Sequence, residues 1–340
     1  MSTTGTDKRG GRSRGMVVVF VLLLVAGGVA YVALRNVRPR DAQAEGTTPP
    51  RGNRGPEAID AILNSALAYM NREEPAKAEL ILAAAIRENP EEQRLYLIHA
   101  EALAALRRPA EAYAAYERAL AIGPREGETE FAAGTLANMI GKPERSIEHY
   151  QAAQRAMKSD PRPSLFLAQV QLKLGQREEA KGNLALAARL APELAVVWGT
   201  WAQIELDENR PGVAAQHAAK ARELEPRVTL WRLLEARALR RDGKAEEALR
   251  LLVYLDEVEQ RDPQVMSVMG ECYGLLGRFA DAAALYARAA EADPANGTLA
   301  METAGWFERA GDKATALRHA ERAAMLATPG AAGMVERLKK

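Results

Sequence analysis

The sequence predicts an all-α protein in which a row of helical hairpins follows one membrane-spanning helix. Three observations predict this fold class. Small residues recur every 34 residues, a period typical of stacked helix–turn–helix units. Residues 16–34 contain no charged side chain over nineteen positions. Aromatic residues make up only 5% of the chain, too few to fill the thick core of a large globular domain, whereas thin helical layers need few large side chains.

The charge of the chain is unevenly distributed. Residues 1–56 hold nine Lys/Arg and three Asp/Glu, a net charge of +6. From the totals of 46 and 45, residues 57–340 keep 37 basic and 42 acidic residues, a net charge of −5. This balance argues against nucleic acid as a partner of the folded part. The basic tail, residues 1–15, flanks the apolar stretch, where such charge serves membrane topology.

Residues 16–34 are predicted to be a transmembrane helix in the lipid bilayer. At about 1.5 Å per residue the stretch approaches the ~30 Å thickness of the hydrocarbon layer. The alternative is a cleaved signal peptide, since Ala42-Gln43-Ala44 offers a small-x-small site. The length of the apolar run and the arginines between it and that site favour an uncleaved, single-pass anchor. Residues 35–56, rich in Pro and Gly, are predicted to be a flexible linker.

The orientation of the anchor is not decided by the charges that flank it. Four basic residues precede the span and five follow it before the repeats, so the positive-inside rule does not decide the matter. From the likeness to signal anchors with a short basic tail, we expect the protein in a bacterial inner (cytoplasmic) membrane. The N-terminus would then lie in the cytoplasm and the repeats in the periplasm.

Residues 57–329 divide into eight units in which three columns of small residues keep the 34-residue spacing. A small side chain lets two antiparallel helices approach closely, so each column is predicted to mark a helix crossing. Leu255 is the one large residue in the third column, and we expect it to widen the local contact. The columns are Ala66, Ala100, Gly134, Ala168, Ala202, Ala236, Gly270, Ala304; Ala78, Ala112, Ser146, Ala180, Ala214, Ala248, Ala282, Ala316; and Ala85, Ala119, Ala153, Ala187, Ala221, Leu255, Ala289, Ala323.

Turn residues support the same division. Six positions 34 residues apart carry a residue that readily adopts positive φ, where the first helix of each hairpin should end: Gly141, Gly175, Asn209, Gly243, Gly277 and Gly311. Glu73 and Arg107 occupy that position in the first two repeats, so we expect the prolines two residues later to end those helices instead. A proline also follows each second helix. Pro161 and Pro263 come three residues late, which predicts second helices nearly one turn longer in repeats three and six.

These residues resemble the tetratricopeptide repeat family. Repeat seven carries the fullest set of the family's positions, namely Gly270, Tyr273, Gly277, Phe279, Ala282, Tyr286, Ala289 and Pro294. The resemblance implies a right-handed superhelical solenoid of eight hairpins. It also implies that the first helices line a concave face, on which side chains select a protein or peptide ligand.

The sequence shows no catalytic chemistry. Its single cysteine, Cys272, excludes a disulfide framework, and we expect it to be a buried small hydrophobe. His149, His217 and His319 share one column on separate repeats, so they cannot bind one metal ion, and we expect them to face solvent. No catalytic or zinc-binding motif is present. We therefore predict no enzyme activity, no cofactor and no metal site.

The candidate peptide-binding groove follows from the resemblance, because the family's ligand-contacting positions lie on the first helices. The first half of this face is the more apolar. The positions are Leu63, Leu67, Met70, Leu97, Glu101, Phe131, Thr135, Asn138, Leu165, Gln169, Leu172, Gln203 and Arg237, followed by Arg240, Ser267 and Glu271. The basic clamp with which some family members bind a C-terminal carboxylate is absent from repeats one to three.

Two functions remain open from the sequence. The first is a membrane-anchored scaffold that mediates protein–protein interactions, as an assembly factor of a membrane or envelope complex. The second is an accessory subunit that presents substrates to a separate enzyme. Residues 330–340 are predicted to form a short C-terminal helix in which Met334 and Leu338 face the last repeat. We expect this cap to be incomplete, leaving Leu317, Ala320 and Ala324 available for a partner or for self-association.

Overall fold

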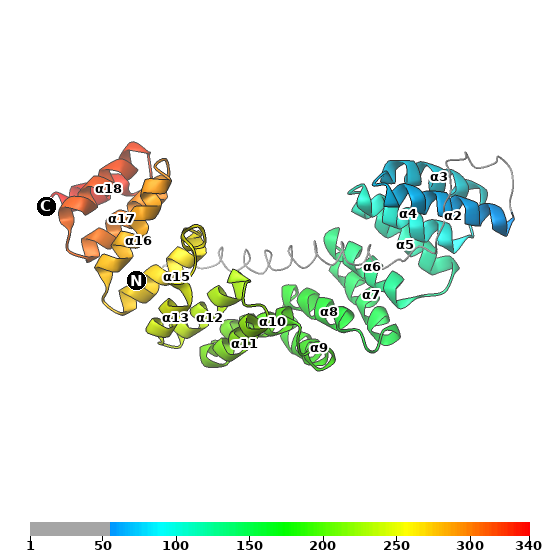
Figure 1. The fold of residues 1–340 in the computed structure, drawn as a ribbon, viewed down its shortest axis with the longest axis horizontal. Coiled ribbons are helices and arrows are strands. Elements are labelled where there is room, and N and C mark those ends of the chain that lie inside the picture. The colour runs from blue at the N-terminus through cyan, green and yellow to red at the C-terminus, as the bar shows by residue number, and fades with distance from the viewer. Residues whose placement is uncertain (1–54) are drawn as a thin grey trace, which may run out of the picture. The chain divides into compact units, whose positions relative to one another are not determined.

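The structure is a computed structural model that describes residues 55–340. The predicted basic tail, the transmembrane helix at 16–34 and nearly all of the linker lie outside the described residues. Within residues 55–340, no helix is both long enough and apolar enough to cross a membrane. The described residues are helices joined by short turns (Figure 1).

The chain forms two compact units, unit 1 up to Leu190 and unit 2 from Ala191 to Lys340. In each unit the helices form successive hairpins, four per unit, and every hairpin packs on the next one within its unit. The helices of unit 1 are α2 (Pro56–Asn71), α3 (Pro75–Glu88), α4 (Gln93–Ala105), α5 (Pro109–Ile122), α6 (Gly127–Met139), α7 (Pro143–Ala156), α8 (Pro161–Lys173) and α9 (Arg177–Leu190). Those of unit 2 are α10 (Ala195–Asp207), α11 (Pro211–Leu224), α12 (Thr229–Arg241), α13 (Ala245–Leu252), α14 (Glu257–Gln260), α15 (Pro263–Leu275), α16 (Phe279–Ala292), α17 (Gly297–Arg309), α18 (Lys313–Met325) and α19 (Ala331–Leu338).

The small-residue columns lie where the two helices of a hairpin cross, as predicted. All eight members of the second column, from Ala78 to Ala316, are fully buried. At Gly134 on α6, an added Cβ would come within 2.8 Å of the Tyr150 ring on α7. Gly270 on α15 meets the Tyr286 ring on α16 at the same 2.8 Å. At these two crossings a tyrosine ring on the second helix occupies the space that a methyl group would need.

The turn inside each hairpin is left-handed even where glycine is missing. Glu73 and Arg107 have φ values of 59° and 60°, the same region as Gly141 at 74°. The expectation that Pro75 and Pro109 end the preceding helices is wrong, because each is the first residue of the next helix. The residue after the turn donates its N–H to a carbonyl five residues back, as Arg108 does to Leu103 O at 2.9 Å. This closing bond offsets the cost of about 1 kcal/mol for a side chain at positive φ.

The late prolines do not lengthen the second helices of repeats three and six. α7 spans 14 residues, as α5 and α9 do. Pro161 and Pro263 are instead the first residues of α8 and α15, a position that needs no backbone N–H. The aspartate before each proline caps the helix, for Asp160 accepts a hydrogen bond from Arg162 N at 2.8 Å. These two prolines therefore mark the start of the next helix and not the end of the preceding one.

Repeat six contains the main irregularity of the fold. α13 has only 8 residues and ends at Leu252, whereas the other second helices have 13 or 14. Leu255 does not widen a helix contact, as we expected; it enters the apolar core of unit 2 from a turn and is 5% exposed. The one-turn helix α14 then begins with a capping box in which Asp256 Oδ1 accepts from Glu259 N at 2.8 Å. The sequence carries the signal for this box, Asp-x-x-Glu, at residues 256–259.

The C-terminal helix α19 covers the last hairpin more fully than predicted. Met334, Val335 and Leu338 are each less than 9% exposed and pack in one cluster with Ala316 and Ala320. Ala320 is fully buried, so it is not available to a partner, contrary to the expectation. The helix presents three apolar side chains on one face, which explains why eight residues suffice once they dock.

Candidate functional site

The predicted groove residues fall into two separate sets. Those on α2, α4, α6 and α8 belong to unit 1, whereas Gln203 on α10 and Arg237 on α12 belong to unit 2. Each unit therefore has a first-helix face of its own.

Four of the predicted positions in unit 1 are buried, namely Leu63, Phe131, Leu165 and Gln169. Phe131 is part of an aromatic cluster, with ring centroids 5.5 Å from Tyr150 and 5.2 Å from Phe166. Its side chain is thereby committed to the packing of α6 against α7 and α8. Gln169 is 5% exposed, and neither atom of its amide has a hydrogen-bonding partner.

The remaining seven positions in unit 1 are partly exposed, and we call them the unit 1 face: Leu67, Met70, Leu97, Glu101, Thr135, Asn138 and Leu172. Two of them already make polar contacts. Thr135 Oγ1 donates to Phe131 O at 3.0 Å and accepts from the Tyr150 hydroxyl at 3.1 Å. Asn138 Oδ1 accepts from Lys173 Nζ at 3.3 Å, and burial lowers the pKa of that lysine. The face thus combines aliphatic side chains with fixed polar groups.

Glu101 is the most unusual group of the unit 1 face. Burial raises its pKa to about 7, because the carboxylate loses hydration. No hydrogen bond or ion pair joins Glu101 to another described residue, so nothing local compensates that loss. An ionisable group with a displaced pKa on a ligand-facing surface is a candidate binding residue.

The first-helix face of unit 2 is more polar, and its groups are already paired. Arg237 Nη2 donates to Gln264 Oε1 at 2.8 Å, and burial lowers the pKa of Arg237. Arg240 forms an ion pair with Glu271, and Gln203 Nε2 donates to Asp207 Oδ1 at 3.1 Å. Because these side chains satisfy one another, the unit 2 face offers fewer free groups to a ligand.

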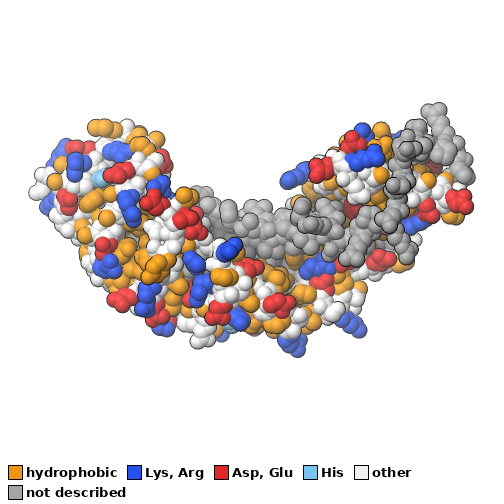
Figure 2. Space-filling model, in the orientation of Figure 1, with side chains coloured by type: hydrophobic (Ala, Val, Ile, Leu, Met, Phe, Trp, Pro, Cys, Tyr) orange, Lys and Arg blue, Asp and Glu red, His pale blue; other side chains and the backbone are white. Residues whose placement is uncertain are grey.

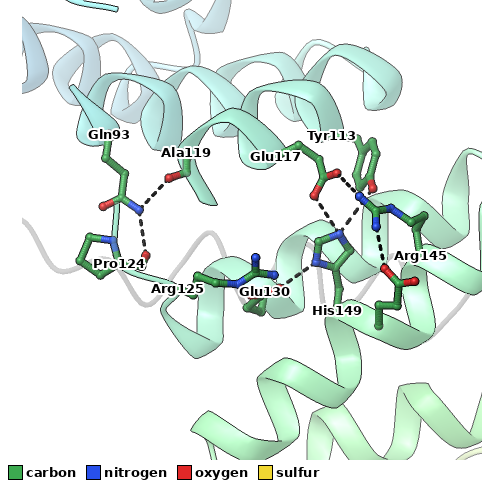
Figure 3. A network of polar contacts seen from close by, with 10 residues as sticks. Gln93, Tyr113, Glu117, Ala119, Pro124, Arg125, Glu130, Arg145 and His149 are labelled. Atoms are coloured by element: carbon green, nitrogen blue, oxygen red, sulfur yellow. Dashed lines mark hydrogen bonds and ion pairs between the residues drawn. The ribbon is translucent and has the colours of Figure 1, made fainter. Parts of the chain in front are cut away.

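The expectation that the histidine column faces solvent is wrong for His149, which is buried, whereas His217 and His319 are half-buried. His149 is 3% exposed and lies between α5, α6 and α7 (Figure 3). Its Nδ1 lies 2.7 Å from Glu130 Oε2, and its Nε2 lies 3.1 Å from Glu117 Oε1. His217 lies with its ring centroid 5.6 Å from that of Trp201, and His319 stacks on Phe307 at 5.5 Å.

The network around His149 joins repeats two and three (Figure 3). Glu130 is 1% exposed and also accepts from Arg125 Nε at 2.6 Å. Arg145 Nη2 donates to Glu117 at 2.8 Å, which ties α7 back to α5. On the neighbouring side, Gln93 Nε2 donates to Ala119 O and Pro124 O at 3.0 and 2.8 Å. Among residues 55–340, no group of three or more His, Cys, Asp and Glu residues could hold a metal ion.

Cys272 lies within the apolar cluster of unit 2, as predicted. It is fully buried on α15, and burial raises the pKa of its thiol to about 11. A thiol of this kind stays protonated and is a weak nucleophile.

Comparisons with known proteins agree with this architecture. The chain matches a family described as the N-terminal TPR repeats region of Psidin over residues 200–317, and one described as tetratricopeptide repeat over residues 63–126. No curated protein matches the chain. Among solved structures, PilW, described as a widely conserved type IV pilus biogenesis factor, is similar with a TM-score of 0.53 and 18% identity, over 63% of this chain and 100% of PilW. Pseudomonas aeruginosa pilF is similar with a TM-score of 0.53 and 19% identity, over 63% of this chain and 98% of pilF. At these identities the likeness shows the fold.

Stacked helical hairpins with a 34-residue period and a left-handed turn in each define a helical-repeat protein. The chain belongs to the tetratricopeptide repeat family.

Proposed function

We propose that the protein is a membrane-tethered scaffold that binds a peptide segment of another protein along the unit 1 face. The observation that carries this proposal is the composition of that face. The first helices leave four apolar side chains and the unpaired Glu101 partly exposed, so that the hairpin packing does not use them fully: Leu67 and Met70 on α2, Leu97 and Glu101 on α4, and Leu172 on α8. Repetition at this spacing suits a ligand that runs across several repeats.

The chemistry of the unit 1 face defines the ligand that it would bind. Leu67 and Leu172 are partly exposed, and covering one such side chain contributes up to about 1.5–3 kcal/mol. Glu101 would gain most from a lysine or arginine, because a cation nearby compensates the carboxylate for its lost hydration. We therefore expect an apolar peptide segment that carries a basic residue.

The membrane part of the proposal comes from the sequence of residues 16–34. The anchor would hold the repeats beside a membrane complex whose assembly they assist. The fold that the chain shares with PilW, a pilus biogenesis factor, is compatible with an assembly role in the cell envelope. Protease added to intact spheroplasts should degrade the repeats if they are periplasmic; digestion only after lysis would reverse the orientation.

The binding face is tested by placing charge on it. In the double variant Leu67→Glu/Leu172→Glu, both side chains start partly exposed, so the fold should persist. Leu165→Glu is unsuitable because Leu165 is 2% exposed and belongs to the interior. The matched control is Leu80→Glu on the second helix α3, where the leucine is 70% exposed. Each full-length protein would be captured from gently solubilised membranes after crosslinking, and the partners quantified by mass spectrometry.

We expect the double variant to lose at least about tenfold of the specific partner, a change of 1.4 kcal/mol or more in binding free energy. The Leu80→Glu protein should capture as much as the parent. Equal capture by all three proteins would show that the unit 1 face is not the binding surface. Circular dichroism would confirm that helicity is unchanged.

A further inference from the structure

The break in repeat six creates a second candidate binding surface, in unit 2 beside the shortened second helix α13. α13 ends after 8 residues, and three adjoining cavities lie beside the break. The central one has a volume of about 340 Å³ and shares Val253 and Tyr273 with a cavity of about 260 Å³ on one side. It shares Gln260, Leu285 and Arg288 with a cavity of about 330 Å³ on the other side. The shared walls make the three a continuous groove, which we call the repeat-six groove.

The lining of the central cavity combines an apolar wall with one free cation. Val253, Met269, Ala284 and Leu285 supply the apolar wall. Two ionised side chains line it, Asp281 and Arg288. Asp281 is bound by Arg278 Nε at 2.7 Å, whereas Arg288 is exposed and makes no hydrogen bond or ion pair with any residue of the described chain.

Two polar groups of the cavity are available to a hydrogen-bond acceptor of a ligand. Gln260 uses its amide nitrogen to bind Val253 O and Leu255 O at 3.0 and 2.8 Å, which satisfies carbonyls at the broken helix end. The Tyr273 ring lies at 5.0 Å from the guanidinium of Arg278, and its hydroxyl makes no hydrogen bond with a described residue. Arg288 and this hydroxyl are thus two donors on one apolar cavity.

Exposed apolar side chains concentrate at the same place. Val253, Tyr254 and Val258 are 40%, 83% and 77% exposed, three of the eleven large hydrophobic residues that the described chain exposes, within six positions. Leu275, at the end of the neighbouring α15, is 64% exposed. On the visible face of unit 2, hydrophobic side chains reach the surface among charged ones (Figure 2). A cluster of this kind on a soluble surface marks an interaction site.

We propose that the repeat-six groove binds a peptide segment of a partner protein in which an acidic side chain lies next to large aliphatic ones. The carboxylate would bind Arg288, and the aliphatic side chains would cover Val253 and Leu285. We expect a helical segment, because the positions of the other repeats that correspond to residues 253–258 form the end of a second helix. The chain's own basic tail is a poor occupant, since residues 1–15 carry four Lys/Arg and one Asp and would be repelled by Arg288.

The test uses the full-length protein in detergent and three fluorescent peptides of 14 residues. The acidic probe has leucines at the i, i+3, i+4 and i+7 positions of a helix and glutamates elsewhere. The neutral probe replaces the glutamates by glutamines, and the tail probe is residues 2–15 of this chain. Binding is followed by fluorescence anisotropy for the parent, for Arg288→Glu and Arg288→Gln, and for the control Arg155→Glu. Arg155 is an exposed arginine on the second helix α7 that likewise makes no ion pair within the described residues.

We expect the acidic probe to bind the parent and the Arg155→Glu control alike. Arg288→Glu should weaken binding about tenfold or more and Arg288→Gln by less, because a charge-assisted hydrogen bond is lost and, in the first case, repulsion is added. The proposal is overturned if the neutral or the tail probe binds as tightly as the acidic one, or if the Arg288 variants bind like the parent. Absence of saturable binding up to about 1 mM, the weak limit of specific recognition, also overturns it. Because the unit 1 face is unchanged in all these proteins, failure here leaves the proposed function untouched.

Discussion

Repeats three and six depart from the regular pattern at the same place in their sequences but differ in structure. Each has its proline three residues late, at Pro161 and Pro263. α7 of repeat three nevertheless keeps its full 14 residues, whereas α13 of repeat six stops after 8. The difference lies at the third crossing column, where repeat three has Ala153 and repeat six has Leu255.

The comparison shows what sets the length of a second helix. Ala153 is fully buried, so there is no free volume beside it for three more carbon atoms. Leu255 cannot occupy such a position in a continuing helix, and the chain unwinds so that its side chain enters the core from a turn. The capping box at Asp256 then starts a new helix. Packing at the crossing, and not the following proline, decides where the helix ends.

The two repeats also differ in how they are held. Repeat three contains the buried pair of His149 and Glu130, which also contacts Glu117 of repeat two, whereas repeat six relies on apolar contacts around Leu252 and Leu255. A polar network is costly to interrupt, because the remaining groups stay buried without partners.

The largest expected effect is therefore on the network of repeat three. His149→Leu should destabilise the protein by about 3 kcal/mol, because Glu130, which is 1% exposed, loses the imidazole as a hydrogen-bonding partner. The matched control is His319→Leu, in the same column of repeat eight, where the ring stacks on Phe307. There we expect a change within about 1 kcal/mol. Urea unfolding followed by circular dichroism gives the free energy of unfolding of both variants. Equal losses would mean that the polar network stabilises the protein no more than ordinary side-chain packing does.

The second prediction transfers the irregularity from repeat six to repeat three. Ala153→Leu should cost about 2 kcal/mol through overpacking of a fully buried position. Ala156→Leu, at an exposed position of the same helix, is the control and should be nearly neutral. Hydrogen exchange should show loss of protection in the last turn of α7. If that turn stays protected, a leucine alone does not break the helix and the capping box is required as well.

The sequence predicted the parts of this architecture that repeat, for a plain physical reason. Hairpin crossings accept only small residues, and left-handed turns favour Gly and Asn, so both leave a periodic trace such as Ala78 to Ala316 or Gly141 to Gly311. The features that depart from the regular repeat were predicted wrongly, because they depend on contacts between repeats. The burial of Phe131 and Leu165, the inward position of His149 and the break at Leu255 follow from which helix packs on which. A single column does not contain that information.

The third prediction concerns Glu101, a half-buried carboxyl group that, unlike Glu130, has no hydrogen-bonding partner among the described residues. The pKa of Glu101 is about 7 in the folded protein, compared with an ordinary value of 4.5. Between these values the folded protein holds a proton that the unfolded chain has released, so stability falls as the pH rises from 4.5 to 7 and stays low above it. Glu101→Gln should therefore raise stability by about 1 kcal/mol at pH 8, an amount reduced by the partial exposure of the side chain, and change nothing at pH 4.

The control for this prediction is Glu193→Gln, at an exposed loop position, which should leave the pH profile of stability unchanged. The midpoint of thermal unfolding at pH 4, 6 and 8 gives the comparison. A gain for Glu101→Gln that is the same at all three pH values would show that burial does not shift the titration of this carboxyl group.

The smallest change in overall stability is expected when repeat six is given the residues of a regular repeat. In Leu255→Ala/Asp256→Ala the leucine no longer has to be buried and the capping box is gone, so α13 should continue through residues 253–258. The lost burial of one leucine is offset by the restored helical hydrogen bonds, and the net change should lie within about 1 kcal/mol. The informative measurement is hydrogen exchange, in which the amides of residues 254–258 should become protected. Asp256→Ala alone is the control, because Leu255 still prevents the helix from continuing, and it should cost about 1 kcal/mol for the lost cap without adding protection.

The longer helix would also fill the repeat-six groove, so the double variant should lose the acidic probe while Asp256→Ala alone retains it. If the double variant gains no protection, contacts other than those of Leu255 and Asp256 end α13. The difference in length between α7 and α13 would then come from the helices that pack around them.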